Sequence, residues 1–174
     1  MTEVWDAIRS KRMVRRFADR PLSTEHLTRI VDAGRHAGSS KNKQRWDFVV
    51  VEDRARLGAL AKVGPFAEHV GGAAAAVALV TPDPTVEGAS LSLVWDAGLA
   101  AENMMLAAWE LGVGSCPATV YEQSVARQVL GIPEARWCGY VLSFGYPADP
   151  EDMRRPPKAG GRRPLEEVMH RETW

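Results

Sequence analysis

The sequence has few of the residues from which disulfide frameworks and metal sites are built. Only two cysteines, Cys116 and Cys138, occur in 174 residues, and they form no C-x-x-C pair. The four histidines show no common spacing. This scarcity excludes a disulfide scaffold and gives no support for a zinc site. We therefore expect two reduced, structural thiols and no metal.

Long hydrophobic runs and net charge are missing as well. The longest apolar run, Gly71 to Val80, is too short to cross a bilayer, and the N-terminal segment contains acidic residues where a signal peptide would be apolar. Lys and Arg number 22, equal to Asp and Glu, which weighs against a nucleic-acid partner. We expect a cytoplasmic protein with no membrane and no nucleic-acid partner.

The remaining composition is typical of a globular domain. Hydrophobic residues make up 45% of the chain and charged residues 25%, which is enough to build a core and a polar surface. No internal repeat, low-complexity tract or linker divides the sequence. We expect residues 1–174 to form one domain.

The positive charge is concentrated in one segment, Arg9 to Phe17 (RSKRMVRRF), where five of the first eight residues are Arg or Lys. Most basic runs are solvated faces without a ligand. Here Val14 and Phe17 are interleaved with the charges and would anchor the segment in a core. Lys11, Arg12 and Arg15 would then point in fixed directions, as a phosphate site requires. The segment predicts an anion site, with a solvated basic face as the alternative.

Hydrophobic periodicity, cap residues and Gly or Pro breaks predict alternating helices and strands. Ser23 is the expected N-cap of the second helix, and Leu57 and Leu60 should face inward from the third. The predicted helices lie around residues 4–8 and over 24–34, 54–63, 92–111 and 123–130, and the predicted strands over 48–51, 73–80, 113–120 and 137–146.

The helix over residues 92–111 is apolar on most of its circumference and ends at Gly112, so we expect it to be central and buried on several sides. The elements lack a strict βαβ period and a GxGxxG turn, which argues against a Rossmann unit. The fold class indicated is α+β, a mixed sheet flanked by helices. Residues 147–174, rich in Pro, Gly and Arg, should form an arm rather than a core element.

Several stretches, in order, resemble one family. KRMVRRF is similar to the N-terminal basic motif of the FMN-dependent nitroreductase family, and SSKNKQRWDFVVVED to its Ser-Ser-x-Asn-x-Gln-Pro-Trp-x-Phe motif followed by a strand. DAGLAAENMMLAAWELGVGSC resembles its buried helix, GIPEARWCGYVLSFGYP its Gly-Ile-Pro turn and strand, and RRPLEEVMH its C-terminal signature. The resemblance implies the nitroreductase-like fold, with the C-terminal arm exchanged in a homodimer.

The sequence departs from the family pattern at four places. Met13 stands where a Ser is usual, Lys11 replaces the first Arg, and Arg45 replaces the Pro before Trp46. The segment between Gly64 and Leu91 is short and lacks the insertion that covers the active site in many members. These departures leave the substrate undefined.

The resemblance also implies a cofactor site for FMN. Lys11, Arg12 and the backbone of Met13 would hold the FMN phosphate together with Arg162, or with Arg163 as the rival candidate. Arg15 would lie at the N1 and O2 edge of the flavin ring and stabilise negative charge there. The remaining cofactor contacts implied are Ser39, Ser40 and Asn42 from the second subunit, and Pro117, Ala118, Thr119 and Val120, with a backbone N–H near Thr119 aimed at N5.

The function implied is an FMN oxidoreductase that moves reducing equivalents in ping-pong fashion from NADH or NADPH, or from a deazaflavin, to a nitroaromatic, quinone or enone. No nucleophile or triad is needed, because the flavin carries the redox step. Two alternatives are a specialised member of the family, which reduces an unsaturated bond or consumes its own flavin, and a non-catalytic flavin-binding protein.

Other side chains fit structural roles. Trp46 and Phe48 suit a core better than a flavin contact. Asp96 is left open between a capping or ion-pair role and a dimer contact. The further structural assignments are Met104, Met105 and Trp109 on a packed helix face, Cys116 as an inert buried thiol, and surface positions for His26, His36, His69 and His170.

Overall fold

The computed structural model describes residues 3–156 and 161–174. Its centre is a four-stranded sheet of β1 (Asp47–Val51), β2 (Ala75–Pro82), β3 (Gly114–Thr119) and β4 (Arg136–Gly145), in the order β1-β2-β4-β3. All neighbouring strands pair antiparallel. Among described residues, the parallel pairing is limited to an isolated bridge between Met13 and Ser115. The expected mixed sheet is therefore corrected to an antiparallel one with a parallel bridge at its β3 edge.

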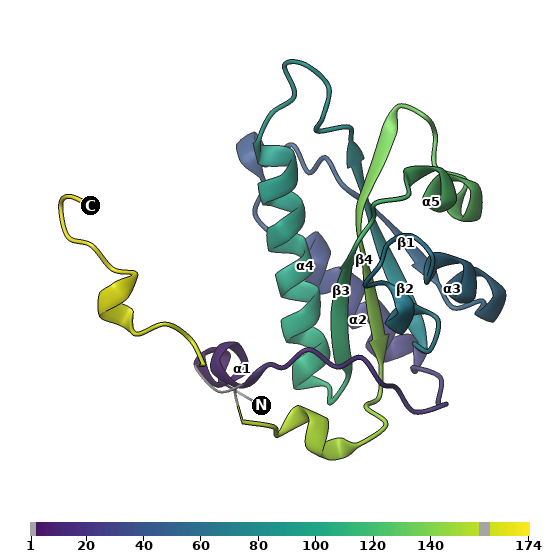
Figure 1. Cartoon of the computed structure of the whole chain (residues 1–174), viewed down its shortest axis with the longest axis horizontal. Helices are drawn as coiled ribbons and strands as arrows, with labels where there is room; N and C mark the ends of the chain where they lie inside the picture. Colours follow the sequence, from purple (N-terminus) through teal and green to yellow (C-terminus); the bar gives the residue numbers. More distant parts are fainter. Residues whose placement is uncertain (1–2, 157–160) are drawn as a thin grey trace.

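Helices cover both faces of this sheet, which confirms the α+β fold (Figure 1). On one face, α2 (Thr24–Arg35) and α4 (Ser92–Glu110) pack on β2 and β4, and on the other α3 (Arg54–Leu60) and α5 (Gln123–Leu130) do so. Alternate residues of β2 enter the two cores. Val77 faces α2 and α4, and Ala78 faces α3 and α5. The long apolar run at β2 is thus a strand buried on both faces.

Local signals set the ends of the helices. Ser23 accepts a hydrogen bond from the backbone N–H of His26 at the start of α2, as expected of an N-cap. Gly112, two residues after the end of α4, has a φ of +71°, the left-handed conformation that Gly adopts at such ends. Leu57 and Leu60 are fully buried in α3. These three predictions are confirmed.

The central helix α4 is buried on one side only, so the expectation of burial on several sides is wrong for the single chain. Its Ala100 and Met104 are fully buried, whereas Leu91, Val94, Trp95 and Leu99 are exposed. No other element of the described chain covers that second side (Figure 1). The short helix α1 (Val4–Ser10) also exposes its apolar residues Val4, Trp5 and Ile8.

The C-terminal arm leaves the body and projects beyond α1 (Figure 1). It contains two short 3-10 helices, η3 (Pro150–Met153) and η4 (Leu165–Glu167). Residues 161–174 are exposed, including the apolar Leu165, Val168, Met169 and Trp174. Exposed apolar side chains on an arm, on α1 and on α4 constitute surface that a folded chain normally buries.

Candidate functional site

The basic segment touches the start of β3 and then crosses to the end of β4, with isolated bridges from Met13 to Ser115 and from Phe17 to Pro147. The backbone N–H of Val14 donates to the carbonyl oxygen of Ser115 at 3.0 Å. The Val14 side chain is fully buried against Gly114, where an added Cβ would lie 2.6 Å from it. Phe17 packs in the same way on Gly145, at 2.9 Å from such a Cβ. Both predicted anchors are confirmed, and close backbone approach at two glycines fixes the segment in place.

Arg12 is held mainly by backbone carbonyls. Its Nε donates to the carbonyl of Arg155 at 2.9 Å, which ties the start of the arm to the basic segment. Its Nη1 donates to the carbonyls of Arg9, Ser10 and Lys11 at 2.7–3.1 Å. Within the described residues, Nη2 has no hydrogen bond and no carboxylate pairs with Arg12. One corner of the guanidinium thus remains available to an anion.

Lys11 is paired with a residue that the sequence patterns did not indicate. Its Nζ lies 3.3 Å from a carboxylate oxygen of Glu102 in α4, and its side chain is 9% exposed. The contact joins residues 91 positions apart, so no local spacing signals it. Because Glu102 already balances this charge, Lys11 is a weaker candidate for a phosphate ligand than Arg12.

Arg15 is exposed and lies beside the buried thiol of Cys116. Burial raises the pKa of Cys116, and the charges of Arg15 and Lys11 act in the opposite direction. No carboxylate of the described residues forms an ion pair with Arg15. Arg15 therefore keeps an unbalanced positive charge at the β3 edge. Cys138, in β4, is buried so deeply that its pKa rises to about 12, as expected for an inert thiol.

His69 is buried, contrary to the expectation of a surface position. It lies in η2 (Glu68–Val70), and its Nδ1 is 2.8 Å from Oγ of Ser143, which in turn donates to the carbonyl of Cys116 at 3.1 Å. Burial lowers the pKa of His69, the charge of Arg15 lowers it further, and the backbone of Pro117 raises it. The neutral ring thus belongs to a polar chain behind β3. These hydrogen bonds join η2, β4 and β3, which are far apart in the sequence, so the sequence around His69 did not predict its burial.

Along β3, the backbone N–H and C=O groups of successive residues point alternately toward β4 and toward the outer edge of the sheet. Ser115 faces the basic segment, whereas the N–H of Val120 donates to Gly139 of the β4 side at 3.0 Å. Pro117 and Thr119 therefore face the same outer side as Ser115, and Pro117 has no N–H. Thr119 presents its N–H on this edge. Gly64 lies close to the carbonyl of Thr119, since a Cβ added to Gly64 would be 2.8 Å from that oxygen.

The loop with Ser39, Ser40 and Asn42 lies apart from the basic segment, at the start of α4 (Figure 1). The backbone N–H of Ser40 donates to Asp96 in α4. No ion pair of Asp96 occurs in the described part of the chain, so of the alternatives left open for Asp96 the capping role is observed. One chain alone does not bring this loop to Arg15.

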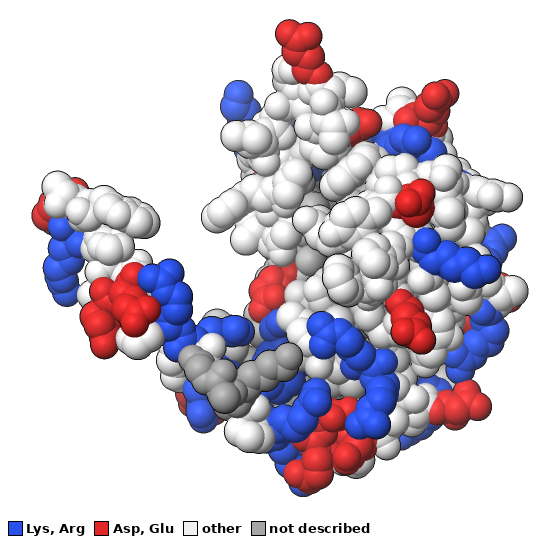
Figure 2. Space-filling view, viewed as in Figure 1, with Lys and Arg blue, Asp and Glu red and all other residues white. Residues whose placement is uncertain are grey.

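Arg162 and Arg163 lie on the arm. Arg163 pairs with Glu167 of the arm itself, at 3.2 Å. Residues 157–160, which precede them, are outside the described residues. The body itself carries Lys and Arg side chains gathered near the base of the arm, interspersed with acids (Figure 2). The face over α4 is largely uncharged.

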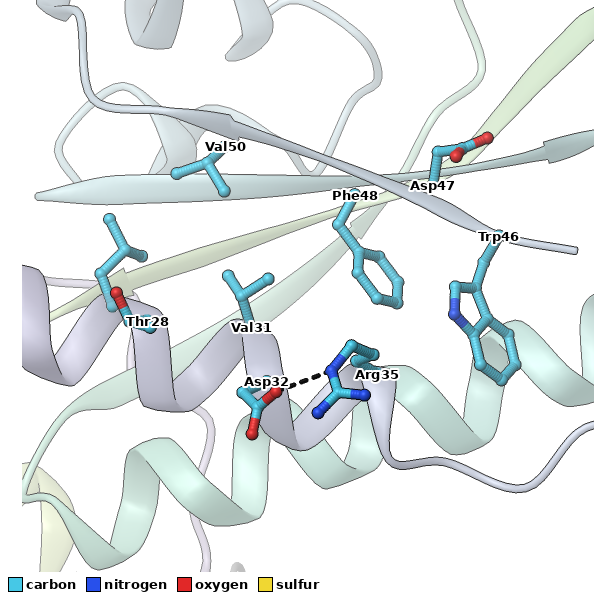
Figure 3. Close-up of a pocket in the computed structure, with 9 residues that line it drawn as sticks. Thr28, Val31, Asp32, Arg35, Trp46, Asp47, Phe48 and Val50 are labelled. Atoms are coloured by element: carbon cyan, nitrogen blue, oxygen red, sulfur yellow. Dashed lines mark hydrogen bonds and ion pairs between the residues drawn. The ribbon is translucent and has the colours of Figure 1, made fainter. Parts of the chain in front are cut away.

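A cavity of about 550 Å³ lies elsewhere, between α2 and the edge strand β1 (Figure 3). Val31, Phe48 and Val50 line it, and the Asp32–Arg35 ion pair stands at its rim. Trp46 stacks on Phe48 with ring centroids 6.2 Å apart. No residue of the basic segment or of β3 lines this cavity. Trp46 is buried, as expected of a core residue.

Comparison with known sequences places this arrangement in a family. The model of the nitroreductase family matches residues 8–89 and 65–146. A protein of Archaeoglobus fulgidus named "Putative NADH dehydrogenase/NAD(P)H nitroreductase" is 35% identical over 179 residues, which cover all of both chains.

Solved structures agree with the sequence comparison. A protein of the same name from Parabacteroides distasonis superposes with a TM-score of 0.85 at 26% identity, covering all of both chains. A nitroreductase-type protein from Desulfovibrio desulfuricans, solved in complex with FMN, gives a TM-score of 0.80 at 27% identity and covers 100% of this chain and 99% of its own. The resemblance drawn from the motifs is confirmed: the chain belongs to the nitroreductase family.

Proposed function

We propose that residues 1–174 form one FMN-binding domain of a homodimeric NAD(P)H oxidoreductase. The observation that carries the proposal is Arg15, an exposed guanidinium without a carboxylate partner in the described residues, beside Cys116 of β3, the strand whose outer edge also carries the backbone N–H of Thr119. A cation and an N–H donor on one edge suit the N1/O2 and N5 positions of a flavin, as the family resemblance implies. The FMN complex of the Desulfovibrio relative supports the choice of cofactor.

The phosphate would lie at the other end of the same segment. Arg12 offers Nη2 there, the Met13 backbone follows it, and Lys11 contributes a charge already shared with Glu102. Arg162 would join from the arm, with Arg163 as the less favoured candidate because Glu167 pairs with it. Charge-assisted hydrogen bonds of this kind are the strong ones in phosphate recognition.

When bound, FMN would supply the redox chemistry, which is the transfer of reducing equivalents from NADH or NADPH to a nitroaromatic, quinone or enone. The chain's own residues bind and orient the group. Arg15 would stabilise negative charge on the flavin ring, and the hydrogen bonds that link His69, Ser143 and the carbonyl of Cys116 would hold β3 in place. The names of relatives, among them an NADPH-dependent oxidoreductase of Staphylococcus epidermidis, support a nicotinamide reductant.

A second chain would complete the site. The exposed apolar residues of α4, α1 and the arm provide the surface for it, and the arm would wrap the partner. Ser39, Ser40 and Asn42 would then reach the flavin of the partner chain.

The decisive experiment mixes purified protein anaerobically with NADH and, separately, with NADPH and follows flavin bleaching. The proposal expects a yellow protein that releases FMN rather than FAD on denaturation, is bleached by a nicotinamide, and is reoxidised by a quinone or nitroaromatic. A colourless protein that ignores added FMN contradicts it. Bound FMN that no nicotinamide bleaches indicates a binding protein or a deazaflavin-dependent enzyme instead.

Arg15→Ala tests the assigned role of Arg15 in the same protein. Loss of the cation should lower the reduction potential of bound FMN more than it weakens FMN binding, because the negative charge that Arg15 stabilises develops on reduction. Arg16→Ala is the matched control, since the Arg16 guanidinium points to Asp152 at 3.9 Å. An unchanged potential in Arg15→Ala contradicts the assignment.

A further inference from the structure

The loop Ser39–Arg45 has an unusual backbone. Lys41, Asn42 and Gln44 all have positive φ values, of 53°, 52° and 47°. Non-glycine residues adopt this left-handed region rarely and at a free-energy cost. Three of them within four positions persist only where the surroundings fix the loop.

Helix α4 provides that fixation through a buried carboxylate. Asp96 is 3% exposed, and its two oxygens accept the backbone N–H of Ser40 at 3.1 and 3.2 Å. No other donor contacts this carboxylate within residues 3–156 and 161–174. Burying a carboxylate with a single N–H donor costs stability, and an apolar residue of the same size would cost less. Asp96 is thus poorly explained as a contribution to the core.

A second contact holds the far end of the loop to the same helix. Arg45 donates from Nη2 to Oγ of Ser92 at 2.8 Å. Ser92 and Asp96 are four residues apart and therefore lie on one face of α4. Within the loop, Oγ of Ser39 accepts the backbone N–H of Gln44 at 3.0 Å. The loop is fixed at both ends and bonded within.

We propose that Asp96 is a positioning residue for FMN, which acts by holding the Ser39–Arg45 loop in the conformation that presents Ser39, Ser40 and Asn42 to the flavin of the partner chain. The inference rests on the proposed function and adds to it a residue that touches no cofactor atom. In physical terms, burying the Asp96 carboxylate lowers the stability of the apoprotein, and the loop conformation that it fixes strengthens FMN binding.

The first test replaces Asp96 by Leu and by Asn. Asp96→Leu should leave the melting temperature of the apoprotein unchanged or raised, yet weaken FMN binding by about ten-fold or more, because a charge-assisted hydrogen bond is lost. Asp96→Asn keeps an acceptor oxygen and should retain most of the affinity. Asp32→Asn, at an exposed ion pair of α2, is the control and should change neither. If Asp96→Leu lowers both the melting temperature of the apoprotein and the affinity for FMN, the role of Asp96 is merely structural and the proposal is overturned.

The second test leaves Asp96 in place and removes its donor. Ser40→Ala deletes only the hydroxyl, whereas Ser40→Pro also deletes the N–H. Proline is tolerated at this first position of a 3-10 helix (η1, Ser40–Asn42), because the preceding residue Ser39 is extended, with φ −141° and ψ 150°. Ser40→Pro should bind FMN about ten-fold more weakly than Ser40→Ala. In the Asp96→Leu background the two should bind alike.

Amide hydrogen exchange of the apoprotein separates this inference from the proposed function. Residues 39–45 should exchange about ten-fold faster in Asp96→Leu, or in Ser40→Pro if the former does not fold, than in wild type. Unchanged exchange overturns the role of Asp96, whether or not FMN binds. If wild type ignores FMN while exchange rises in the variant, the proposed function fails and Asp96 positions the loop for another ligand. Equal FMN affinity of Ser40→Pro and Ser40→Ala also overturns the inference.

Discussion

Gly34 of α2 presents its Cα to the side chain of Met104 in α4, so closely that an added Cβ would lie 2.2 Å from Cε of Met104. Both residues are buried, and the helices α2 and α4 meet at this point. Glycine inside a helix normally weakens it by about 1 kcal/mol relative to alanine. Here the absence of a side chain at Gly34 lets α2 and α4 pack closely against each other.

Gly34→Ala should therefore destabilise the protein by about 1–3 kcal/mol, because overpacking of the core outweighs the gain in helix propensity. Urea denaturation followed by circular dichroism measures the change. Gly58→Ala in α3 is the matched control: nothing lies within 4 Å of its added Cβ, and it should stabilise by about 0.5–1 kcal/mol. Equal and positive effects of the two substitutions would show that Met104 moves aside without cost.

Gly34 also illustrates what the sequence can and cannot predict. Periodicity and cap residues are local signals, and they correctly predicted α2 with its Ser23 cap and the basic segment anchored by Val14. They also predicted a buried strand over residues 73–80, which the structure has two residues later, at 75–82. They did not predict that Gly34 faces Met104, because that contact depends on how two helices cross.

The same limit applies to the candidate site. The cluster of Lys11, Arg12 and Arg15 was visible because the three charges fall within five positions of the sequence. The Glu102 partner of Lys11 and the buried His69 were not, since each comes from an element far away in the chain. The sheet order and the antiparallel pairing likewise depend on long-range pairing energies. The exposed side of α4 was not predicted either, because an apolar helix in the sequence does not show which of its sides the rest of the chain covers.

The exposed apolar face of α4 leads to a prediction about assembly. Wild type should be a dimer at micromolar concentration, with an interface above about 2,000 Å², as is typical of obligate dimers. Trp95→Glu places a charge on a side chain that is now 70% exposed in the single chain, and it should shift the protein toward monomer because the charge would have to be buried. Multi-angle light scattering measures the mass. Ala55→Glu, on the exposed side of α3, should leave the dimer intact. A monomeric wild type would contradict both the dimer and the shared site.

The buried His69 leads to a prediction about pH. Its pKa in the folded protein is lowered from the ordinary value of 6.5 by burial and by Arg15. Below about pH 6.5 the unfolded state therefore binds a proton that the folded state does not, so the free energy of unfolding falls as pH falls. Above that pH the contribution is constant.

His69→Gln should remove this pH dependence: its melting temperature should decline less than that of wild type between pH 7 and pH 5. Calorimetry at a series of pH values measures the difference. His170→Gln, at an exposed position of the arm, should decline as wild type does. Parallel pH profiles of wild type and His69→Gln would mean that His69 is protonated as readily in the folded state as in the unfolded one.

The last prediction concerns the phosphate site, which would be built from both ends of the chain. Arg12→Ala should weaken FMN binding about ten- to a hundred-fold, because a charge-assisted contact to a dianion contributes roughly 1.5–3 kcal/mol. Arg162→Ala should cost a similar amount, and Arg163→Ala less, since Arg163 is paired with Glu167. Fluorescence titration of the apoprotein with FMN measures each affinity.

The double variant Arg12→Ala/Arg162→Ala distinguishes a shared phosphate from two separate charges. Residues that grip the same anion should depart from additivity, whereas independent surface charges add within roughly 0.5 kcal/mol. Because Arg12 also holds the Arg155 carbonyl, its replacement frees the start of the arm, and dimer mass must be checked in each variant. Arg16→Ala removes a charge from the same segment and should bind FMN as wild type does, since its guanidinium lies near Asp152. Wild-type affinity in both Arg12→Ala and Arg162→Ala would place the FMN phosphate elsewhere and leave the basic segment as a solvated face.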